Sequence, residues 1–204
     1  MSTPDPPQPM KLVLASASPR RRELLAQAAY AFTVEAADVD ESQREGEEPA
    51  AYVLRLAEEK AHAIFARHRA EDVEDDPLVV LGADTCVVCE GEILGKPVDT
   101  SDAARMLRLL SGRTHRVLTG LAVVTRAGVV GDVEATEVVF ADIPEAELTV
   151  YCATPEPLDK AGAYGIQGYA ARWIPRIDGC YFNVMGLPIA QTVRLIEDAL
   201  RNLD

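Results

Sequence analysis

Three consecutive arginines stand directly after a serine and a proline near the start of the chain. In "LASASPRRRELL", Ser18 is expected to cap a helix and Pro19 to be its first residue. Arg20, Arg21 and Arg22 would then fill the first turn, where unpaired backbone N–H groups and the helix dipole favour negative charge. The stretch is therefore a candidate anion site with guanidinium donors suited to phosphate. A capped surface helix with a solvated basic patch has the same pattern, and this stretch alone does not separate the two.

Four other charged residues stand where they could serve such a ligand. Asp84, in "GADT", ends an apolar run and places a carboxylate where α/β proteins commonly bind ligands, although a turn cap would explain it equally well. Lys60 lies close to the apolar face of an expected helix, which suits a ligand contact or an aliphatic stem that reaches solvent. Lys96 stands between a glycine and a proline in "GKP", and Glu41 belongs to an acidic loop where solvation is the simpler interpretation.

The elements that must position these residues follow from the hydrophobic pattern. Apolar runs predict strands over 11–15, 32–35 and 78–89, a brief strand before Pro97, and a hairpin over 114–143 joined at "RAGVV". Helical spacing predicts helices over 19–29, 49–69, 101–110 with Ser101 as cap, 144–153 and 188–200. This order predicts a single mixed α/β domain over 11–204. Residues 1–10, rich in proline, are expected to form a disordered tail.

Composition narrows the classes of partner. The net charge of −13, from 20 basic and 33 acidic residues, argues against broad binding to nucleic acid or to an anionic membrane. No apolar run approaches the roughly 18 residues of a membrane span. Four cysteines are too few for a disulfide scaffold of this size, so we expect a cytoplasmic protein.

Taken in order, five stretches resemble the Maf family, also called septum formation inhibitor proteins, whose members are nucleoside triphosphate pyrophosphatases. They are "LASASPRRRELL", "LAEEKA", "LGADTCVVCEGEILGKP", "LSGRTHRVLTGLAVV" and "DKAGAYGIQG". The resemblance spans residues 11 to about 190, and the ordered set is far more specific than any one stretch. It implies an α/β fold of the Maf/ITPase-like kind, with a mixed, elongated sheet flanked by helices and two lobes around a deep nucleotide-binding cleft.

The resemblance also implies an activity and a set of roles. The activity is cleavage of a nucleoside triphosphate between its α and β phosphates with a divalent metal, usually Mg²⁺ or Mn²⁺, in a protein that often forms homodimers. Positions that match triphosphate-binding residues are Ser16, Arg20, Arg21, Lys60 and Lys96. Asp84 matches the catalytic proton acceptor, and Glu41 matches an acidic position that would share the metal with it. The residue types alone leave open whether Asp84 activates water or holds the metal.

The expected base is a pyrimidine. Arg20, Thr85 and Gln167 match the positions that select the base in the dTTP/UTP branch of the family. A single glutamine amide can donate to a carbonyl of uracil or thymine and accept from its N–H, whereas the positive charge of 7-methylguanine would favour a carboxylate or an aromatic face. We therefore expect dTTP and UTP to be hydrolysed in a housecleaning role on the nucleotide pool, with a link to arrest of cell division. The alternatives are modified nucleotides (5-methyl-UTP, pseudo-UTP or 7-methyl-GTP) and a non-catalytic nucleotide-binding regulator of septum formation.

Overall fold

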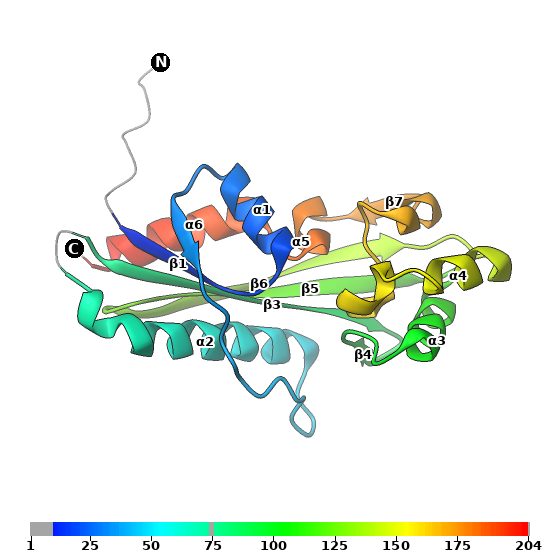
Figure 1. The fold of residues 1–204 in the computed structure, drawn as a ribbon, viewed down its shortest axis with the longest axis horizontal. Coiled ribbons are helices and arrows are strands. Elements are labelled where there is room, and N and C mark those ends of the chain that lie inside the picture. Colours follow the sequence, from blue (N-terminus) through cyan, green and yellow to red (C-terminus); the bar gives the residue numbers. More distant parts are fainter. Residues whose placement is uncertain (1–9, 74–75, 204) are drawn as a thin grey trace, which may run out of the picture.

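One long mixed β-sheet runs through the molecule in a computed structural model that describes residues 10–73 and 76–203 (Figure 1). Its strands are β1 (Lys11–Ala15), β2 (Phe32–Val34), β3 (Leu78–Cys89), β4 (Glu92–Leu94), β5 (Thr114–Thr125), β6 (Gly128–Val139) and β7 (Arg176–Asp178). Their order is β2-β1-β3-β5-β6-β7, with β4 also paired to β3. β1 is parallel to β2 and β3, and the remaining pairs are antiparallel.

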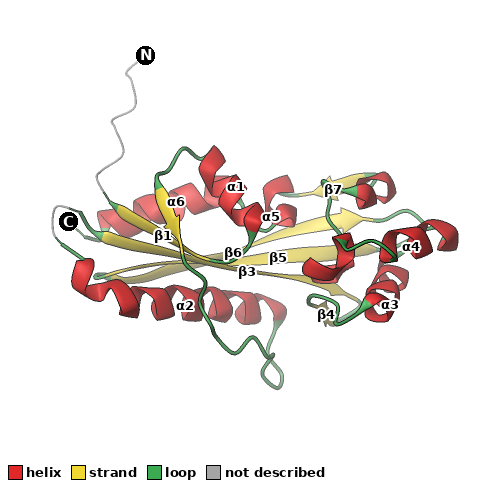
Figure 2. Cartoon of the chain, in the orientation of Figure 1, coloured by secondary structure: helices red, strands yellow, loops and turns green. Residues whose placement is uncertain are grey.

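Helices cover both faces of this sheet (Figure 2). They are α1 (Pro19–Gln27), α2 (Pro49–His68), α3 (Thr100–Leu110), α4 (Glu145–Cys152), α5 (Tyr181–Met185) and α6 (Ile189–Arg201). Short 3₁₀ helices are η1 (Arg69–Glu71), η2 (Glu156–Asp159), η3 (Ala161–Ala163) and η4 (Tyr169–Trp173). In Figure 1, α2 lies along one face, α1 and α6 lie on the other, and α3 and α4 gather at one end.

The central strand β3 alternates its side chains between the two helical layers, as a two-residue period requires. Val79 and Leu81 belong to the core that also contains Leu24 of α1. Val80 belongs to the opposite core, which contains Ala57 of α2. Because burial on both faces demands apolar residues throughout, β3 reads as a nearly continuous valine-rich run.

Two glycines let α2 lie directly against the sheet. A Cβ atom on Gly82 would come within 2.0 Å of the carbonyl oxygen of Ala57, and one on Gly120 within 2.3 Å of that of Val53. Only glycine leaves room for such an approach of helix backbone to strand backbone. The contact fixes how far α2 stands from β3, and therefore where Lys60, one turn beyond Ala57, can reach.

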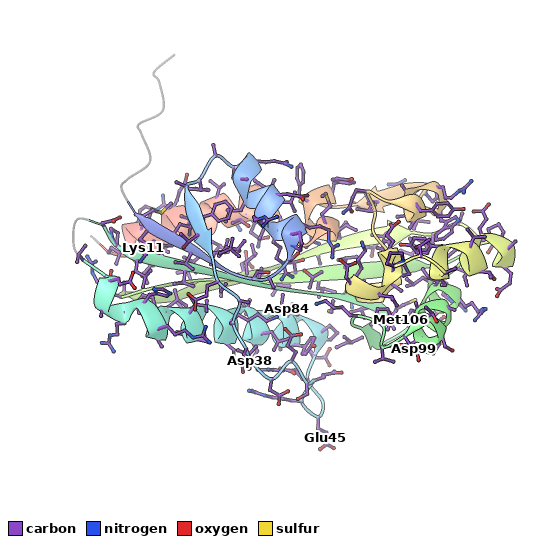
Figure 3. The ribbon with its side chains drawn as sticks, in the orientation of Figure 1. Lys11, Asp38, Glu45, Asp84, Asp99 and Met106 are labelled. Carbon is purple, nitrogen blue, oxygen red and sulfur yellow. The ribbon has the colours of Figure 1, made fainter. Side chains whose placement is uncertain are left out.

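The apolar side chains form cores at both ends of the long sheet. One core joins α3, α4 and the ends of β3, β5 and β6, and contains Met106 and Tyr151. The others join α1, α2 and α6 to the opposite half of the same strands. In Figure 3, Lys11 and Met106 lie toward opposite ends of the molecule with Asp84 between them. The half of the sheet with α1, α2 and α6 forms one lobe, and the half with α3 and α4 forms the other (Figure 1). The predicted α/β class, with a mixed elongated sheet flanked by helices and two lobes, is confirmed.

The sheet has a gap beside β3. β1 pairs with β3 as far as Ala15, which lies opposite Gly82, and β4 begins its pairing at Val87. Within the described part of the chain, residues 83–86 therefore have a strand neighbour on the β5 side alone. This change of neighbour, from a parallel to an antiparallel strand, is the kind of position at which open α/β sheets bind ligands.

Most predicted elements are present, with local differences. The helix expected from Ser101 begins at Thr100, because the side chain of Asp99 accepts a hydrogen bond from the Asp102 N–H at 2.8 Å and is the cap. The hairpin turn is confined to residues 126–127, since Gly128 already pairs with Thr125. The glycine-rich segment 159–188 holds short 3₁₀ helices, β7 and α5. Residues 1–9 of the expected disordered tail lie outside the described residues, and no described helix is long and apolar enough to cross a membrane.

Candidate active site

A cavity of about 580 Å³ opens at the gap in the sheet. Every residue that the sequence singled out as a candidate lines it: Ser16, Arg20, Arg21, Glu41, Lys60, Asp84, Thr85, Lys96 and Gln167. These residues come from the β1–α1 turn, α1, the acidic loop, α2, β3, the β4–α3 loop and the segment after η3. The cavity is therefore bounded by both lobes.

The first wall is the start of α1, which forms as the sequence predicts. Ser18 has an extended backbone, and its Oγ accepts from the N–H of Arg21 at 3.4 Å, while Pro19 is the first helical residue. The first turn of α1 carries no acidic residue. Arg20 and Arg21 line the cavity, and Arg22 is exposed and is not among the lining residues. Pro19 has no N–H, and the N–H groups of Arg21 and Arg22 donate to Ser18, so the first turn of α1 serves the cavity through the side chains of two of its three arginines.

Arg21 is held by three protein acceptors. Its Nε donates to the carbonyl oxygen of Gly186 at 2.9 Å, its Nη2 to the hydroxyl of Thr85 at 2.9 Å, and its Nη1 to the hydroxyl of Ser16 at 3.3 Å. Burial lowers the pKa of Arg21 from its usual value of 12.5, and the charge of Asp84 acts in the opposite sense. A guanidinium is not deprotonated in proteins, so Arg21 stays charged near neutral pH. A fixed cation therefore stands against the cavity.

Lys60 joins two carboxylates at the opposite wall. Its Nζ lies 2.6 Å from Asp84 Oδ1 and 2.6 Å from Glu41 Oε1. The side chains of Lys60 and Asp84 are 9% and 13% exposed, whereas that of Glu41 is 57% exposed. Burial acts to raise the pKa of Glu41, but the hydrogen bond and charge of Lys60, with Lys96 and Arg21, hold this pKa below its usual value. The result is a compact group of alternating charges beside the gap.

The acidic loop that carries Glu41 is attached to α2. The carbonyl oxygen of Glu41 accepts from the hydroxyl of Tyr52 at 2.9 Å, and Arg55 makes a bidentate ion pair with Glu47 at 2.6 and 2.8 Å. Burial, with the charges of Asp84 and Glu41, raises the pKa of Tyr52 to about 12, so it remains a donor. Tyr52 also lines the cavity. The sequence placed it only on an apolar helix face, and no spacing signal distinguishes it from its core neighbours.

Arg20 spans the cavity to the other lobe. Its Nη1 donates to the carboxylate of Asp159 at 3.1 Å and its Nη2 to the carbonyl oxygen of the same residue at 3.3 Å. Lys160 donates to the other carboxylate oxygen of Asp159 and to the carbonyl oxygen of Glu156, each at 2.6 Å. Asp159 and Lys160 were not assigned a role from the sequence. The sequence could have identified them, because they are the first two residues of the "DKAGAYGIQG" stretch.

The two remaining candidates lie on the exposed side of the cavity. Lys96 and Gln167 are both exposed and both line it, from the β4–α3 loop and from the segment before η4. Tyr164, close to Gln167 in sequence, is buried and receives support from His115, whose Nε2 lies 2.8 Å from the tyrosine hydroxyl. An amide is thus available at the rim of the cavity.

Comparison with known proteins agrees with this geometry. A family model described as Maf-like protein matches residues 11–199. The chain belongs to the Maf family. It is 50% identical over 190 residues to a dTTP/UTP pyrophosphatase of Colwellia psychrerythraea, covering 93% of this chain and 88% of the relative. It is 48% identical over 190 residues to one of Koribacter versatilis, covering 93% and 95%. It is 51% identical over 185 residues to one of Geobacter sulfurreducens, covering 90% and 93%.

The donor set of this Maf protein suits the divalent metal that the resemblance implies. Among the described residues there is no group of three or more His, Cys, Asp or Glu that could form an all-protein metal site. Glu41 and Asp84 nevertheless converge on one point, now held by the ammonium of Lys60. Mg²⁺ is usually bound by one or two carboxylates together with substrate phosphates and water. Two hard oxygen donors beside a cavity lined by cationic side chains fit that description.

Proposed function

We propose that this Maf protein hydrolyses dTTP and UTP, with water, to the nucleoside monophosphate and pyrophosphate. The observation that carries the proposal is one cavity lined by five cations, Arg20, Arg21, Lys60, Lys96 and Lys160, together with the buried carboxylate of Asp84. A polyanionic substrate requires cationic side chains to bind it. Hydrolysis requires a group that accepts a proton from water, such as the Asp84 carboxylate. The names carried by relatives that are about half identical support the same substrates.

The cations would bind the triphosphate and stabilise the charge that develops on its oxygens. Arg21 has five N–H donors, and its three protein bonds leave two of them, one on each terminal nitrogen. Two such donors match two oxygens of one phosphate. Because the protein already fixes the guanidinium, little side-chain entropy is lost on binding.

Asp84 is the proposed acceptor of the proton from the attacking water. Lys60 holds its Oδ1, so this carboxylate has a defined orientation, and its Oδ2 remains to accept a proton. A Mg²⁺ or Mn²⁺ held by Glu41 and Asp84 would neutralise charge on the phosphate oxygens. Lys60 must then serve both as the partner of these carboxylates and as a phosphate contact.

Selection of the base is assigned to Gln167, with Arg20 and Thr85. Gln167 supplies one donor and one acceptor at the exposed rim of the cavity, which is the pattern that uracil and thymine require. Arg20 is fixed by Asp159 and can orient the same part of the ligand. This arrangement favours pyrimidines over purines and over the positively charged 7-methylguanine.

Pyrophosphate release from a nucleotide panel tests the proposal. The panel holds dTTP, UTP, 5-methyl-UTP, pseudo-UTP, CTP, ATP and 7-methyl-GTP, each with Mg²⁺, with Mn²⁺ and with excess chelator. We expect dTTP and UTP to lead and the chelator to abolish turnover. Faster hydrolysis of 7-methyl-GTP than of dTTP would contradict the base assignment. Nucleotide binding without pyrophosphate release would favour the regulatory alternative.

The proposed substrates also suggest a cellular role and a compartment for this Maf protein. Clearance of nucleotides from the cytoplasmic pool is the proposed role, and the four cysteines, all free thiols in the structure, suit a reducing compartment. No nucleic-acid partner is proposed, given the net charge of −13. A homodimer remains a prediction from the resemblance, and light scattering of the purified protein tests it.

A further inference from the structure

A chain of buried hydroxyl groups leads from the cavity into the sheet. Thr85 on β3 lies opposite Thr119 on β5, and their Oγ atoms are 2.9 Å apart. Thr119 is fully buried, lies behind Thr85 as seen from the cavity and is not among the residues that line it. Thr119 belongs to the stretch "LSGRTHRVLTGLAVV", but neither the residue roles implied by the resemblance nor the proposed mechanism uses it.

The carbonyl oxygen of Asn183 fixes the direction of the hydrogen bonds between Thr119 and Thr85. Thr119 Oγ lies 3.3 Å from the carbonyl oxygen of Asn183, which can only accept, so the single hydroxyl proton of Thr119 is directed there. Thr85 must then donate its own proton to Thr119. Its oxygen is left as an acceptor, and that is the role in which it receives the N–H of Arg21 at 2.9 Å.

This row of hydrogen bonds ends at α5, and the residue after α5 contacts Arg21 from the other side. Asn183 belongs to α5, and its Nδ2 donates to the carbonyl oxygen of Val117 and to the hydroxyl of Thr136, both at 2.9 Å. Gly186, the residue that follows α5, accepts from Arg21 Nε. Two of the three restraints on the guanidinium, those from Thr85 and Gly186, therefore depend on one short, buried polar network.

We propose that Thr119 is a positioning residue for the hydrolysis of nucleoside triphosphates. It orients the hydroxyl of Thr85 as an acceptor, and this holds the guanidinium of Arg21 with its two remaining N–H donors toward the phosphates. The proposal rests on the proposed function. Without the acceptor at position 119, the proton of Thr85 is free to turn toward Arg21, where it opposes the N–H of the guanidinium instead of accepting from it.

Substitution by valine tests this role, because valine has the shape of threonine without the hydroxyl. We expect Thr119→Val to lower kcat/KM for UTP roughly tenfold, the effect of losing one charge-assisted hydrogen bond, and Thr119→Ser to restore it. Thr192→Val is the matched control. Thr192 is equally buried, its hydroxyl donates to the carbonyl oxygen of Pro188 at 2.9 Å, and it lies on α6 away from the cavity. That variant should keep the activity of the wild type.

A double-mutant cycle separates positioning from a purely structural effect. If Thr119 acts through Arg21, Thr119→Val should cost nothing further in an Arg21→Lys background, where no guanidinium remains to be oriented. An unchanged kcat/KM in Thr119→Val, or a loss of the same size in both backgrounds, would overturn the proposal. Melting temperatures of all variants show whether the comparison is made between equally folded proteins.

Failure of this inference is distinguishable from failure of the proposed function. If the wild type releases no pyrophosphate from any nucleotide, the proposed function is wrong. Titration calorimetry with inorganic pyrophosphate then decides the inference, since Arg21 is expected to bind a phosphate in either case. Weaker binding to Thr119→Val than to the wild type supports the positioning role, and equal binding overturns it.

Discussion

Lys60 holds together two carboxylates, and its replacement by methionine should destabilise the protein strongly. Methionine keeps the length and the apolar stem of the side chain but removes the charge. The side chains of Lys60 and Asp84 are 9% and 13% exposed, so Asp84 would be left buried without its partner. Removing one member of a buried ion pair costs about 3–5 kcal/mol. For a chain of this size the melting temperature should then fall by about 6–20 °C.

Thermal unfolding of four proteins tests this expectation. They are the wild type, Lys60→Met, Asp84→Asn and the double variant. Because the cost arises from the unpaired charge of Asp84, the double variant should be markedly more stable than Lys60→Met alone. Lys11→Met is the matched control, since Lys11 forms an exposed pair with Glu71 that is worth about 0–1 kcal/mol.

The pH dependence provides a second measurement on the same variants. Lys60 contributes to holding the pKa of Glu41 below its usual value of 4.5. The folded-state value lies below the unfolded-state value, so this pair stabilises the protein above about pH 4.5 and the contribution is lost as the pH falls through the folded-state value. In Lys60→Met this part of the acid sensitivity should be absent.

The reasoning would be refuted by two results. One is a melting temperature of Lys60→Met as close to the wild type as that of the Lys11→Met control. The other is that Lys60→Met lowers the melting temperature equally in the wild type and in the Asp84→Asn variant, because the ion pair would then contribute nothing to the loss of stability.

Three further predictions concern single residues. Asp84→Asn should abolish pyrophosphate release while calorimetry still detects nucleotide binding; near-normal turnover would remove Asp84 from the mechanism. Gly82→Ala should lower the free energy of unfolding in urea by about 1–3 kcal/mol and reduce pyrophosphate release, because a Cβ atom 2.0 Å from the carbonyl oxygen of Ala57 must push α2 and Lys60 away from the sheet. An unchanged free energy of unfolding and an unchanged activity would show that α2 can move without cost. Burial lowers the pKa of His115 from 6.5 to about 4, so the unfolded chain takes up a proton first and stability should fall as the pH drops from about 6.5 to 4. His115→Gln should show less of this loss in urea unfolding at pH 7 and pH 5, and an identical pH dependence would contradict the assignment.

The parts of the site that the sequence predicts are those set by neighbours along the chain. Ser18 and Pro19 begin α1 because capping and the fixed φ of proline act within one turn. The valine-rich run of β3 is apparent because burial on both faces leaves no alternative composition. The cap of α3 was misplaced because Asp99 and Ser101 both have suitable oxygens, and only the backbone conformation decides between them.

The parts that could not be predicted depend on contacts between distant residues. Arg20 meets Asp159 across 139 positions, and Arg21 meets Gly186 across 165. A sequence shows that Arg20 and Arg21 are charged, but not which acceptors take up their N–H groups. The gap between β1 and β4 is likewise a property of strand pairing, although it decides why Asp84 and Thr85 face a cavity instead of another strand.

The strands β3 and β5 pass without interruption from one lobe into the other, each over twelve residues. A rigid-body rotation of one lobe against the other would have to bend or shear this shared sheet. We therefore expect adjustment to a bound nucleotide in side chains and in the loops that line the cavity. The pairing of β3 with β5 fixes the spacing of the two lobes, so a nucleotide of the wrong shape should be excluded by a fixed opening rather than by failure to trigger a closing motion.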